Sequence, residues 1–246
     1  MNGPAERAGG AGGRPPAMNG PAERAGGAGG RPPAMTLPCA AVLFDVDGTL
    51  VDSTPLVERA GREWAAEYGI DPDVFMAGAH GRRTSDRVAE FLPADQVREA
   101  TARLDALEAT STDGIIALPG ALELLADMSG LPHAFVTSMD RAQLKVRTGV
   151  AGVPSPPIVV TAEDVPDGKP DPSGYLQAAR RLGVEPSACV VVEDAPAGIA
   201  AGRAAGATVL ALVTSHPEES LTAAHHVVQD LSRVRATPAG LRLTVG

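Results

Sequence analysis

Lysine is almost missing from this sequence, which contains only Lys145 and Lys169 among its 246 residues. The formal net charge is -9, and the pI is near 5.0. Affinity for nucleic acids depends on clustered Lys and Arg side chains, so this balance argues against a protein that binds a phosphate backbone. We therefore expect no nucleic-acid partner.

Cysteines and long apolar runs are also scarce. Cys39 and Cys189 lie far apart and are flanked by apolar residues, which is typical of small core side chains and not of a disulfide framework or a metal site. No apolar stretch approaches the roughly 20 residues that a membrane helix needs, and the N-terminus lacks the apolar segment of a secretory signal. We expect a soluble cytoplasmic protein with no membrane partner, acting as a monomer or a homodimer.

The N-terminal region consists of a duplicated segment. Residues 1–17 recur unchanged as residues 18–34, and both copies are dominated by Gly, Pro and Ala without a periodic apolar face. Such a segment has almost nothing to bury, so it is not the unit of a repeat architecture. We predict a disordered tail over residues 1–34, with Met35 opening the folded part.

Short apolar runs alternate with helical patterns after Met35. Runs that are apolar throughout are typical of strands covered on both faces by helices. The alternation predicts an α/β fold with a doubly wound parallel sheet. The predicted strands are 39–44, 133–138, 157–162, 188–193 and 208–214, and the predicted helices between them are 120–128, 141–150, 172–184 and 196–207.

One long stretch breaks this alternation. Residues 55–118 contain helical periodicity and no run that resembles a strand. We predict an inserted all-helical cap domain over 55–118, which lies over the end of the first strand. The α/β core would then comprise residues 35–54 and 119–246.

Polar residues follow four of the predicted strands directly. In open parallel sheets, ligands bind beyond the carboxyl ends of the strands, so these residues should meet at one edge. Gathered carboxylates raise one another's pKa values unless a cation lies among them, and oxygen ligands without His or Cys favour Mg²⁺. The residues are Asp45 and Asp47, Thr137 and Ser138, Asp164 and Lys169, and Glu193 and Asp194.

The order of these motifs resembles that of the haloacid dehalogenase (HAD) superfamily. The four motifs are "DVDGT" (45–49), "VTS" (136–138), "KP" (169–170) and "VVEDAPAG" (191–198). The resemblance covers essentially Met35 to Asp230. It implies a Rossmann-like core and a phosphatase of the subgroup that acts on glycerol phosphate and sugar phosphates.

The resemblance also implies roles for single residues. Asp45 would be the nucleophile that forms an aspartyl-phosphate, and Asp47 would be the general acid and base. Thr137, the Ser138 amide and Lys169 would stabilise the phosphoryl oxygens. Mg²⁺ would be held by Asp45, by the Asp47 backbone carbonyl and by Asp194, with Glu193 as a further or water-mediated ligand.

Simpler structural interpretations exist for each motif taken alone. An Asp-x-Asp-Gly sequence is often a turn, and Thr137-Ser138 or Glu193-Asp194 could cap the helix that follows. Arg141 could be a solvated helix residue, although related phosphatases often carry an Arg there, so we include it as a substrate-binding candidate. The four motifs in the correct order favour the catalytic interpretation.

The expected substrate is a small phosphorylated polyol or sugar. The segment "AHGRRTSDRV" (79–88) resembles the substrate loop of the subgroup, which tends to have His-Gly-x-Arg-Thr. We assign substrate contacts to His80 and to Arg82, which we match to the Arg of the subgroup. For Arg83, a solvated helix-end position and a functional one are equally acceptable. The early cap has little aromatic surface to stack a nucleobase.

Features of the sequence argue against three other reactions or roles. β-Phosphoglucomutases carry a histidine about twelve residues after the nucleophile, where this chain has Val57, so hydrolysis is favoured over phosphomutase activity. Phosphonate-cleaving members need a lysine from the cap, and residues 55–118 contain none. A phosphate-accepting receiver module would lack both the insertion and Asp47.

Overall fold

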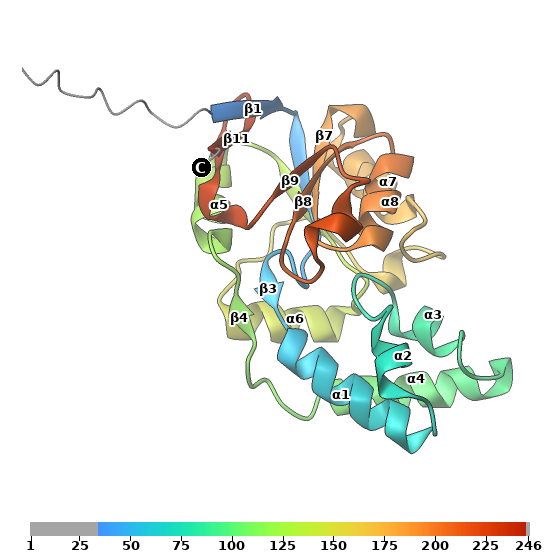
Figure 1. The fold of residues 1–246 in the computed structure, drawn as a ribbon. Helices are drawn as coiled ribbons and strands as arrows, with labels where there is room; N and C mark the ends of the chain where they lie inside the picture. Colours follow the sequence, from blue (N-terminus) through green and yellow to red (C-terminus); the bar gives the residue numbers. More distant parts are fainter. Residues whose placement is uncertain (1–33, 245–246) are drawn as a thin grey trace, which may run out of the picture. The chain divides into compact units, whose positions relative to one another are not determined.

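The central feature is a sheet of six parallel strands in the order β6-β5-β2-β7-β8-β9. Figure 1 labels three of them, β7, β8 and β9. The structure is a computed structural model and describes residues 34–244. β2 and β7 at the centre are buried at every position, as strands covered on both faces must be. The strands are β2 (Ala41–Phe44), β5 (His133–Val136), β6 (Val159–Val160), β7 (Cys189–Glu193), β8 (Thr208–Leu212) and β9 (His226–Val228).

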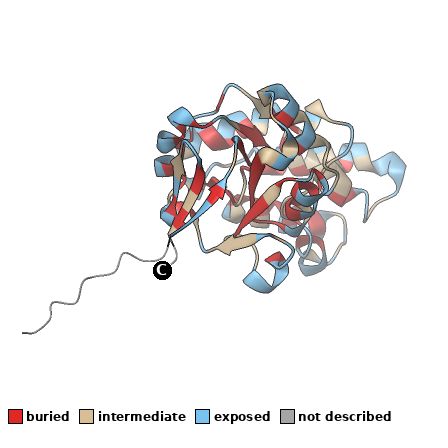
Figure 2. Cartoon of the chain, turned by 90° about the horizontal axis from the view of Figure 1, so that it is seen from above, coloured by how far each residue is buried: buried red, intermediate tan, exposed pale blue. Residues whose placement is uncertain are grey.

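Helices cover both faces of this sheet. Alternate residues of β2 face opposite sides: Phe44 shares an apolar cluster with Leu124 of α5 (Ala121–Asp127) and Leu144 of α6 (Arg141–Ala151). Leu43 belongs to a second cluster, on the face covered by α7 (Ser173–Leu182) and α8 (Pro196–Ala204). Figure 2 shows the buried strands between exposed helix surfaces. The predicted doubly wound α/β fold is confirmed.

The inserted segment is helical and has an apolar cluster of its own. Its helices are α1 (Thr54–Glu67), α2 (Pro72–Met76), α3 (Thr84–Val88) and α4 (Ala94–Glu108). Trp64 is fully buried at the centre, stacks on Phe75, and donates its indole N–H to the carbonyl of Ala100 at 2.8 Å. The division into a core and a cap domain stays a prediction. Below, "cap" denotes residues 55–118.

The chain enters and leaves the cap through a two-stranded antiparallel ladder. β3 (Val51–Asp52) pairs with β4 (Ile116–Ala117), with Val51 opposite Ala117. β4 lies inside the stretch for which we predicted no strand. A ladder of two residues per strand is too short to give an alternating pattern in sequence.

A three-stranded antiparallel sheet was also missed by the sequence analysis. β1 (Ala34–Pro38), β11 (Gly240–Thr244) and β10 (Val234–Thr237) lie in the order β1-β11-β10. β1 and β10 each have one buried residue, and the alternation of Leu241 and Leu243 with Arg242 and Thr244 in β11 is too short to stand out in the sequence. β1 contains Met35 and also Ala34, the last residue of the predicted tail, so Ala34 belongs to a strand. The rest of the predicted disordered tail lies outside the described residues.

Short 3₁₀ helices occupy connections between these elements. They are η1 (Met128–Gly130), η2 (Ala162–Asp164), η3 (Pro186–Ala188), η4 (Glu218–Leu221) and η5 (Leu231–Arg233). None of the helices within residues 34–244 has the length and apolar character needed to cross a bilayer.

Candidate active site

The loop after β2 places two aspartates at the carboxyl edge of the sheet. The Asp45 amide donates to the carbonyl of Val192 on the neighbouring β7, which fixes Asp45 against that strand. The Asp45 residue is only 3% exposed. The loop then turns at Gly48, whose φ is +79°, in the left-handed region that favours glycine. A Cβ at Gly48 would lie 2.0 Å from Asp194 Oδ2, so glycine is also required for close packing.

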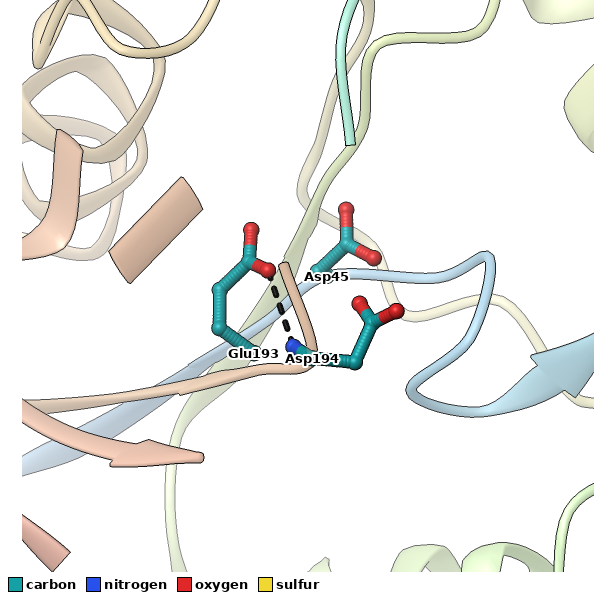
Figure 3. A group of neighbouring side chains, drawn as sticks. All are labelled: Asp45, Glu193 and Asp194. Atoms are coloured by element: carbon teal, nitrogen blue, oxygen red, sulfur yellow. Dashed lines mark hydrogen bonds between the residues drawn. The ribbon is translucent and has the colours of Figure 1, made fainter. Parts of the chain in front are cut away.

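Asp45 and Asp194 point toward one another, with Glu193 beside them (Figure 3). One carboxylate oxygen from each of the three residues lies within 4.8 Å of the others, and all three residues are buried. Burial raises the pKa of the Asp45 carboxyl to about 7, and Lys169 opposes this shift. Burial, Glu193 and Asp45 also raise the pKa of Asp194 well above its ordinary value. A cation among these groups would remove the repulsion.

The donors to each carboxylate distinguish the three residues. Asp45 Oδ1 accepts from Lys169, whereas Asp45 Oδ2 is buried without a hydrogen-bond partner. Asp194 accepts from the Thr49 hydroxyl at 3.2 Å and from the Ser215 hydroxyl. Asp45 Oδ2 is therefore a buried acceptor that a metal ion or a substrate would satisfy.

Glu193 is fully occupied by donors from the protein. Its Oε1 accepts from Lys169 Nζ at 2.7 Å and from the Tyr175 hydroxyl at 2.8 Å. Its Oε2 accepts from the backbone amides of Asp194 at 2.9 Å and Ala195 at 3.1 Å. Glu193 thus holds Lys169 and the start of the loop after β7, and in this arrangement it has no oxygen free of a donor.

Lys169 lies between two carboxylates in the buried part of the site. Burial lowers the pKa of Lys169, but the negative charges of Asp45 and Glu193 outweigh this effect and hold its pKa above the usual value. Lys169 is 6% exposed. Its ammonium group is therefore charged and held against Asp45.

The second motif follows β5 on the other side of β2. Thr137 is buried and lines a cavity together with Asp45, and its hydroxyl accepts from the Met139 amide at 3.1 Å. Ser138 donates from its hydroxyl to the Gly81 carbonyl of the cap at 3.0 Å. Ser138 therefore joins the core to the loop that carries His80 and Arg82.

Asp47 is held by two residues that the sequence analysis did not identify. Its Oδ1 accepts from the Ser53 hydroxyl at 2.8 Å, and its Oδ2 accepts from Arg147 Nη1 at 2.6 Å. Arg147, on α6, also donates to Glu108 at the end of α4 in the cap. Arg147 is buried, and nothing in the apolar periodicity of residues 141–150 distinguishes it from an exposed helix residue.

Ser215 is a further residue that the sequence analysis missed. It follows β8, where it donates to Asp194, and its hydroxyl lies 2.8 Å from Nδ1 of His216. The rule that ligands bind beyond the carboxyl ends of parallel strands would have found Ser215, because it comes directly after the predicted strand 208–214.

His80 and Arg82 line a cavity together with Asp45, Asp47 and Thr137. The cavity has a volume of about 60 Å³. The His80 ring lies edge-on to His216 with centroids 5.7 Å apart, and burial lowers the pKa of His80, as do His216 and Arg87. Arg82 lines the cavity but also pairs with Glu90 at 2.6 Å.

The assignment of the subgroup's arginine to Arg82 needs correction. In His-Gly-x-Arg-Thr, the x falls on Arg82 and the Arg falls on Arg83. Arg83 donates to the carbonyls of Val165 and Pro166, both at 2.8 Å, in the loop that precedes Lys169. Arg83 is therefore not a solvated helix-end residue, because it joins the cap to the core.

Arg141 does not join the other predicted site residues. Its guanidinium pairs with Asp164 at 2.6 Å and with Glu163 at 3.4 Å on the surface, and 56% of its side chain is exposed. It is not among the residues that line the cavity. Asp164, which follows the third predicted strand, is used in this pair and in the turn at Thr161.

The sequence of this chain matches a known protein family. The haloacid dehalogenase-like hydrolase family matches residues 39–206, which include all four motifs. The chain belongs to this family.

Curated relatives and solved structures agree with this membership of the haloacid dehalogenase-like hydrolases. Hexitol phosphatase A of Escherichia coli (strain K12) is 43% identical over 205 residues, which cover 81% of this chain and 94% of the relative. Glycerol-1-phosphate phosphohydrolase 2 of Saccharomyces cerevisiae is 34% identical over 192 residues, or 73% of this chain and 77% of the relative. A hydrolase from Pseudomonas syringae has a TM-score of 0.72 at 26% identity, covering 78% of this chain and 94% of that one.

Proposed function

We propose that this hydrolase is a Mg²⁺-dependent phosphatase that cleaves the phosphate monoester of a small polyol or sugar through an aspartyl-phosphate on Asp45. The observation that carries the proposal is the state of Asp45: a buried carboxylate with one oxygen held by Lys169 and the other without a partner. Its neighbours Thr137 and Lys169 are donors suited to a phosphate.

The proposed reaction has two steps: Asp45 is first phosphorylated, and the phosphoryl group is then transferred to water. In the first, an Asp45 oxygen forms a bond to phosphorus, the ester P–O bond breaks, and Asp47 gives a proton to the departing alkoxide. In the second, Asp47 takes a proton from water, whose oxygen bonds to phosphorus, and the bond between Asp45 and phosphorus breaks. Inorganic phosphate and the free alcohol are the products.

Asp47 must exchange a hydrogen-bond partner to do this. Ser53 and Arg147 occupy its two oxygens, so one of these contacts yields when the leaving-group oxygen approaches. Ser53 is the neutral partner. Arg147 joins Asp47 to Glu108 of the cap, so the orientation of Asp47 depends on the position of the cap.

The acidic residues fit a divalent cation. The buried Asp45 Oδ2 lacks a partner, Asp194 faces it, and the donor set consists of oxygen atoms, as Mg²⁺ prefers. Asp45, Asp194 and the Asp47 carbonyl would hold the ion, which when bound neutralises charge on the transferring phosphoryl group. Glu193, whose oxygens already accept from protein donors, would act through Lys169 instead.

The substrate class follows from the relatives and from the cavity. Hexitol phosphatase A and glycerol-1-phosphate phosphohydrolase 2 are named for polyol phosphates, which supports a polyol or sugar phosphate here. His80 and Arg82 present polar groups to the same cavity. Val57 also lines the cavity, at the position where phosphomutases carry a histidine, so the phosphomutase alternative gains no support.

The direct test is a phosphate-release screen over glycerol phosphate, hexitol phosphates and hexose phosphates, with Mg²⁺ and with a chelator. We expect phosphate release that requires Mg²⁺ and is lost in Asp45→Asn. Isomer conversion without free phosphate would instead indicate a phosphomutase. Undiminished release by Asp45→Asn would refute the proposed nucleophile.

A further inference from the structure

Arg87 on α3 is a buried arginine for which the reaction above has no use. It is 4% exposed, and its Nε and Nη2 atoms are buried without a hydrogen-bond partner. Its guanidinium carbon lies 4.6 Å from the centre of the Phe75 ring, which orients the planar group by a cation–π contact. Arg87 lines the same cavity as Asp45.

The other two arginines of this cavity have carboxylate partners. Arg82 pairs with Glu90, and Arg147 pairs with both Asp47 and Glu108. Among the ion pairs of residues 34–244 none involves Arg87. The negative charges of Glu108 and Glu90 both act on Arg87, but Glu108 Oε2 already accepts from Arg147, and Glu90 Oε1 accepts from Arg82.

An unpaired buried charge destabilises a folded protein. Burial lowers the pKa of Arg87 to about 10, with Glu108 opposing the shift, so the guanidinium is still protonated at neutral pH. A guanidinium that is buried without a hydrogen-bond acceptor, in the wall of a substrate cavity, is expected where a bound ligand supplies that acceptor.

The position of Arg87 indicates which part of a substrate it would meet. The core residues around Asp45 provide the donors for the phosphate, whereas Arg87 belongs to the cap. The same cavity, of about 60 Å³, is lined by residues of both the core and the cap, so we place the phosphate of a small substrate at Asp45. The end of the substrate remote from phosphorus then faces the cap.

We propose that Arg87 is a specificity residue, which binds oxygen atoms of the leaving group and so selects polyol phosphates over simple alkyl phosphates. This inference rests on the proposed phosphatase function and adds the basis of its substrate choice. A guanidinium has five N–H donors in a planar fork, which suits two adjacent oxygens. These oxygens are hydroxyls in a polyol and could equally belong to a carboxylate.

The test compares two esters that differ only in hydroxyl groups: glycerol 3-phosphate and n-propyl phosphate. In Arg87→Met the ratio of kcat/KM for glycerol 3-phosphate to that for propyl phosphate should fall by roughly 10- to 100-fold, the range for hydrogen bonds to a charged group. An unchanged ratio would overturn the inference. A wild-type protein that releases phosphate from neither ester, nor from any sugar phosphate, would instead refute the proposed function.

A substrate that carries a carboxylate distinguishes between hydroxyl and carboxylate oxygens as the acceptors for Arg87. If wild type prefers 3-phosphoglycerate to glycerol 3-phosphate and Arg87→Met loses that preference, the acceptor is anionic. If the loss is confined to glycerol 3-phosphate, the acceptors are hydroxyls. Either result supports contact with the leaving group only together with a fall in the ratio of glycerol 3-phosphate to propyl phosphate, and equal losses on all three esters contradict it.

Two controls separate binding from folding. Arg103→Met removes a cap arginine that pairs with Glu67 outside the cavity and should leave the ratio unchanged. The thermal midpoint of Arg87→Met should equal or exceed that of wild type, because an unpaired buried charge is removed. If this variant does not fold, Arg87→Lys keeps the charge without the fork and must still lower the ratio for the inference to survive.

Discussion

The Arg147 guanidinium donates a 2.6 Å hydrogen bond to Asp47, which lies one hundred residues earlier in the chain. The same guanidinium holds Glu108, so one buried side chain links the proposed acid and base to the end of a cap helix. The position of the cap and the orientation of Asp47 are therefore coupled through Arg147.

Removing Arg147 should lower the unfolding free energy through Glu108 and lower kcat through Asp47. Arg147→Met leaves Glu108 buried without its partner, and we expect a loss of about 3–5 kcal/mol of unfolding free energy together with a lower kcat. Adding Glu108→Gln removes the uncompensated charge and should restore much of the stability, while kcat stays low because Asp47 still lacks its donor. Urea unfolding and steady-state kinetics on the two variants check this. Recovery of kcat in the double variant would contradict the coupling.

The sequence was sufficient to predict that the residues directly after parallel strands meet at one edge of the sheet. Asp45, Thr137, Glu193 and Asp194 each come directly after an apolar run, and parallel strands bring their carboxyl ends to one edge, so their meeting could be predicted. Lys169 lies further beyond its predicted strand, in a longer loop, so the strand-end rule placed it less firmly, and the resemblance of its motif supported the assignment.

Contacts between helices far apart in sequence could not be predicted in this way. Arg147 lies on the buried side of α6 because the cap covers that side, which periodicity within α6 does not reveal. Arg82 and Arg83 are adjacent residues of the same type, and matching the subgroup's pattern residue by residue distinguishes Arg83, but its contact with the core loop is seen only in the structure. The three-stranded sheet of β1, β10 and β11 was missed because its short strands carry few buried residues.

Gly48 should be required for Mg²⁺ binding by the cluster of Asp45, Glu193 and Asp194, and not only because its backbone has a positive φ. In Gly48→Ala the new Cβ would lie 2.0 Å from Asp194 Oδ2, so the carboxylate must move, and we expect Mg²⁺ affinity to fall roughly 10- to 100-fold. Gly69 is a matched control, since its φ is also positive, at +68°, but a Cβ there meets nothing within 4 Å. Titration of activity with Mg²⁺ compares the two. An equal effect of both substitutions would show that only backbone strain matters.

Metal binding should stabilise the folded protein through Asp194. Mg²⁺ at about 100 times its dissociation constant is expected to add about 2.7 kcal/mol to the unfolding free energy of wild type. Asp194→Asn removes one charge of the cluster, and the Asn oxygen can accept from one of the Thr49 and Ser215 hydroxyls while its amide group donates to the oxygen of the other. This variant should therefore fold in a chelator and gain little from Mg²⁺. Thermal unfolding with Mg²⁺ and with chelator measures the difference. A full Mg²⁺ response in Asp194→Asn would place the ion elsewhere.

The role of Asp47 as an acid should depend on the leaving group. For glycerol phosphate, Asp47→Asn should lower kcat by roughly 10²- to 10⁴-fold, because the alkoxide must leave unprotonated. Phenyl phosphate has a leaving group that needs no proton, so this variant should release a rapid burst of phenol followed by slow turnover, because the second step still lacks its base. Stopped-flow measurement of phenol would detect the burst. Equal rates of the two esters in both phases would argue against Asp47 as the proton donor.

The most direct test of the account is to find the phosphoryl group on the protein. Asp47→Asn mixed with Mg²⁺ and phenyl phosphate is quenched in acid within the burst, digested and examined by peptide mass spectrometry. The account predicts the mass of one phosphoryl group on the peptide that contains Asp45, located at that residue, and none when a chelator replaces Mg²⁺. Turnover without any phosphorylated peptide, or with the group on another residue, would contradict it.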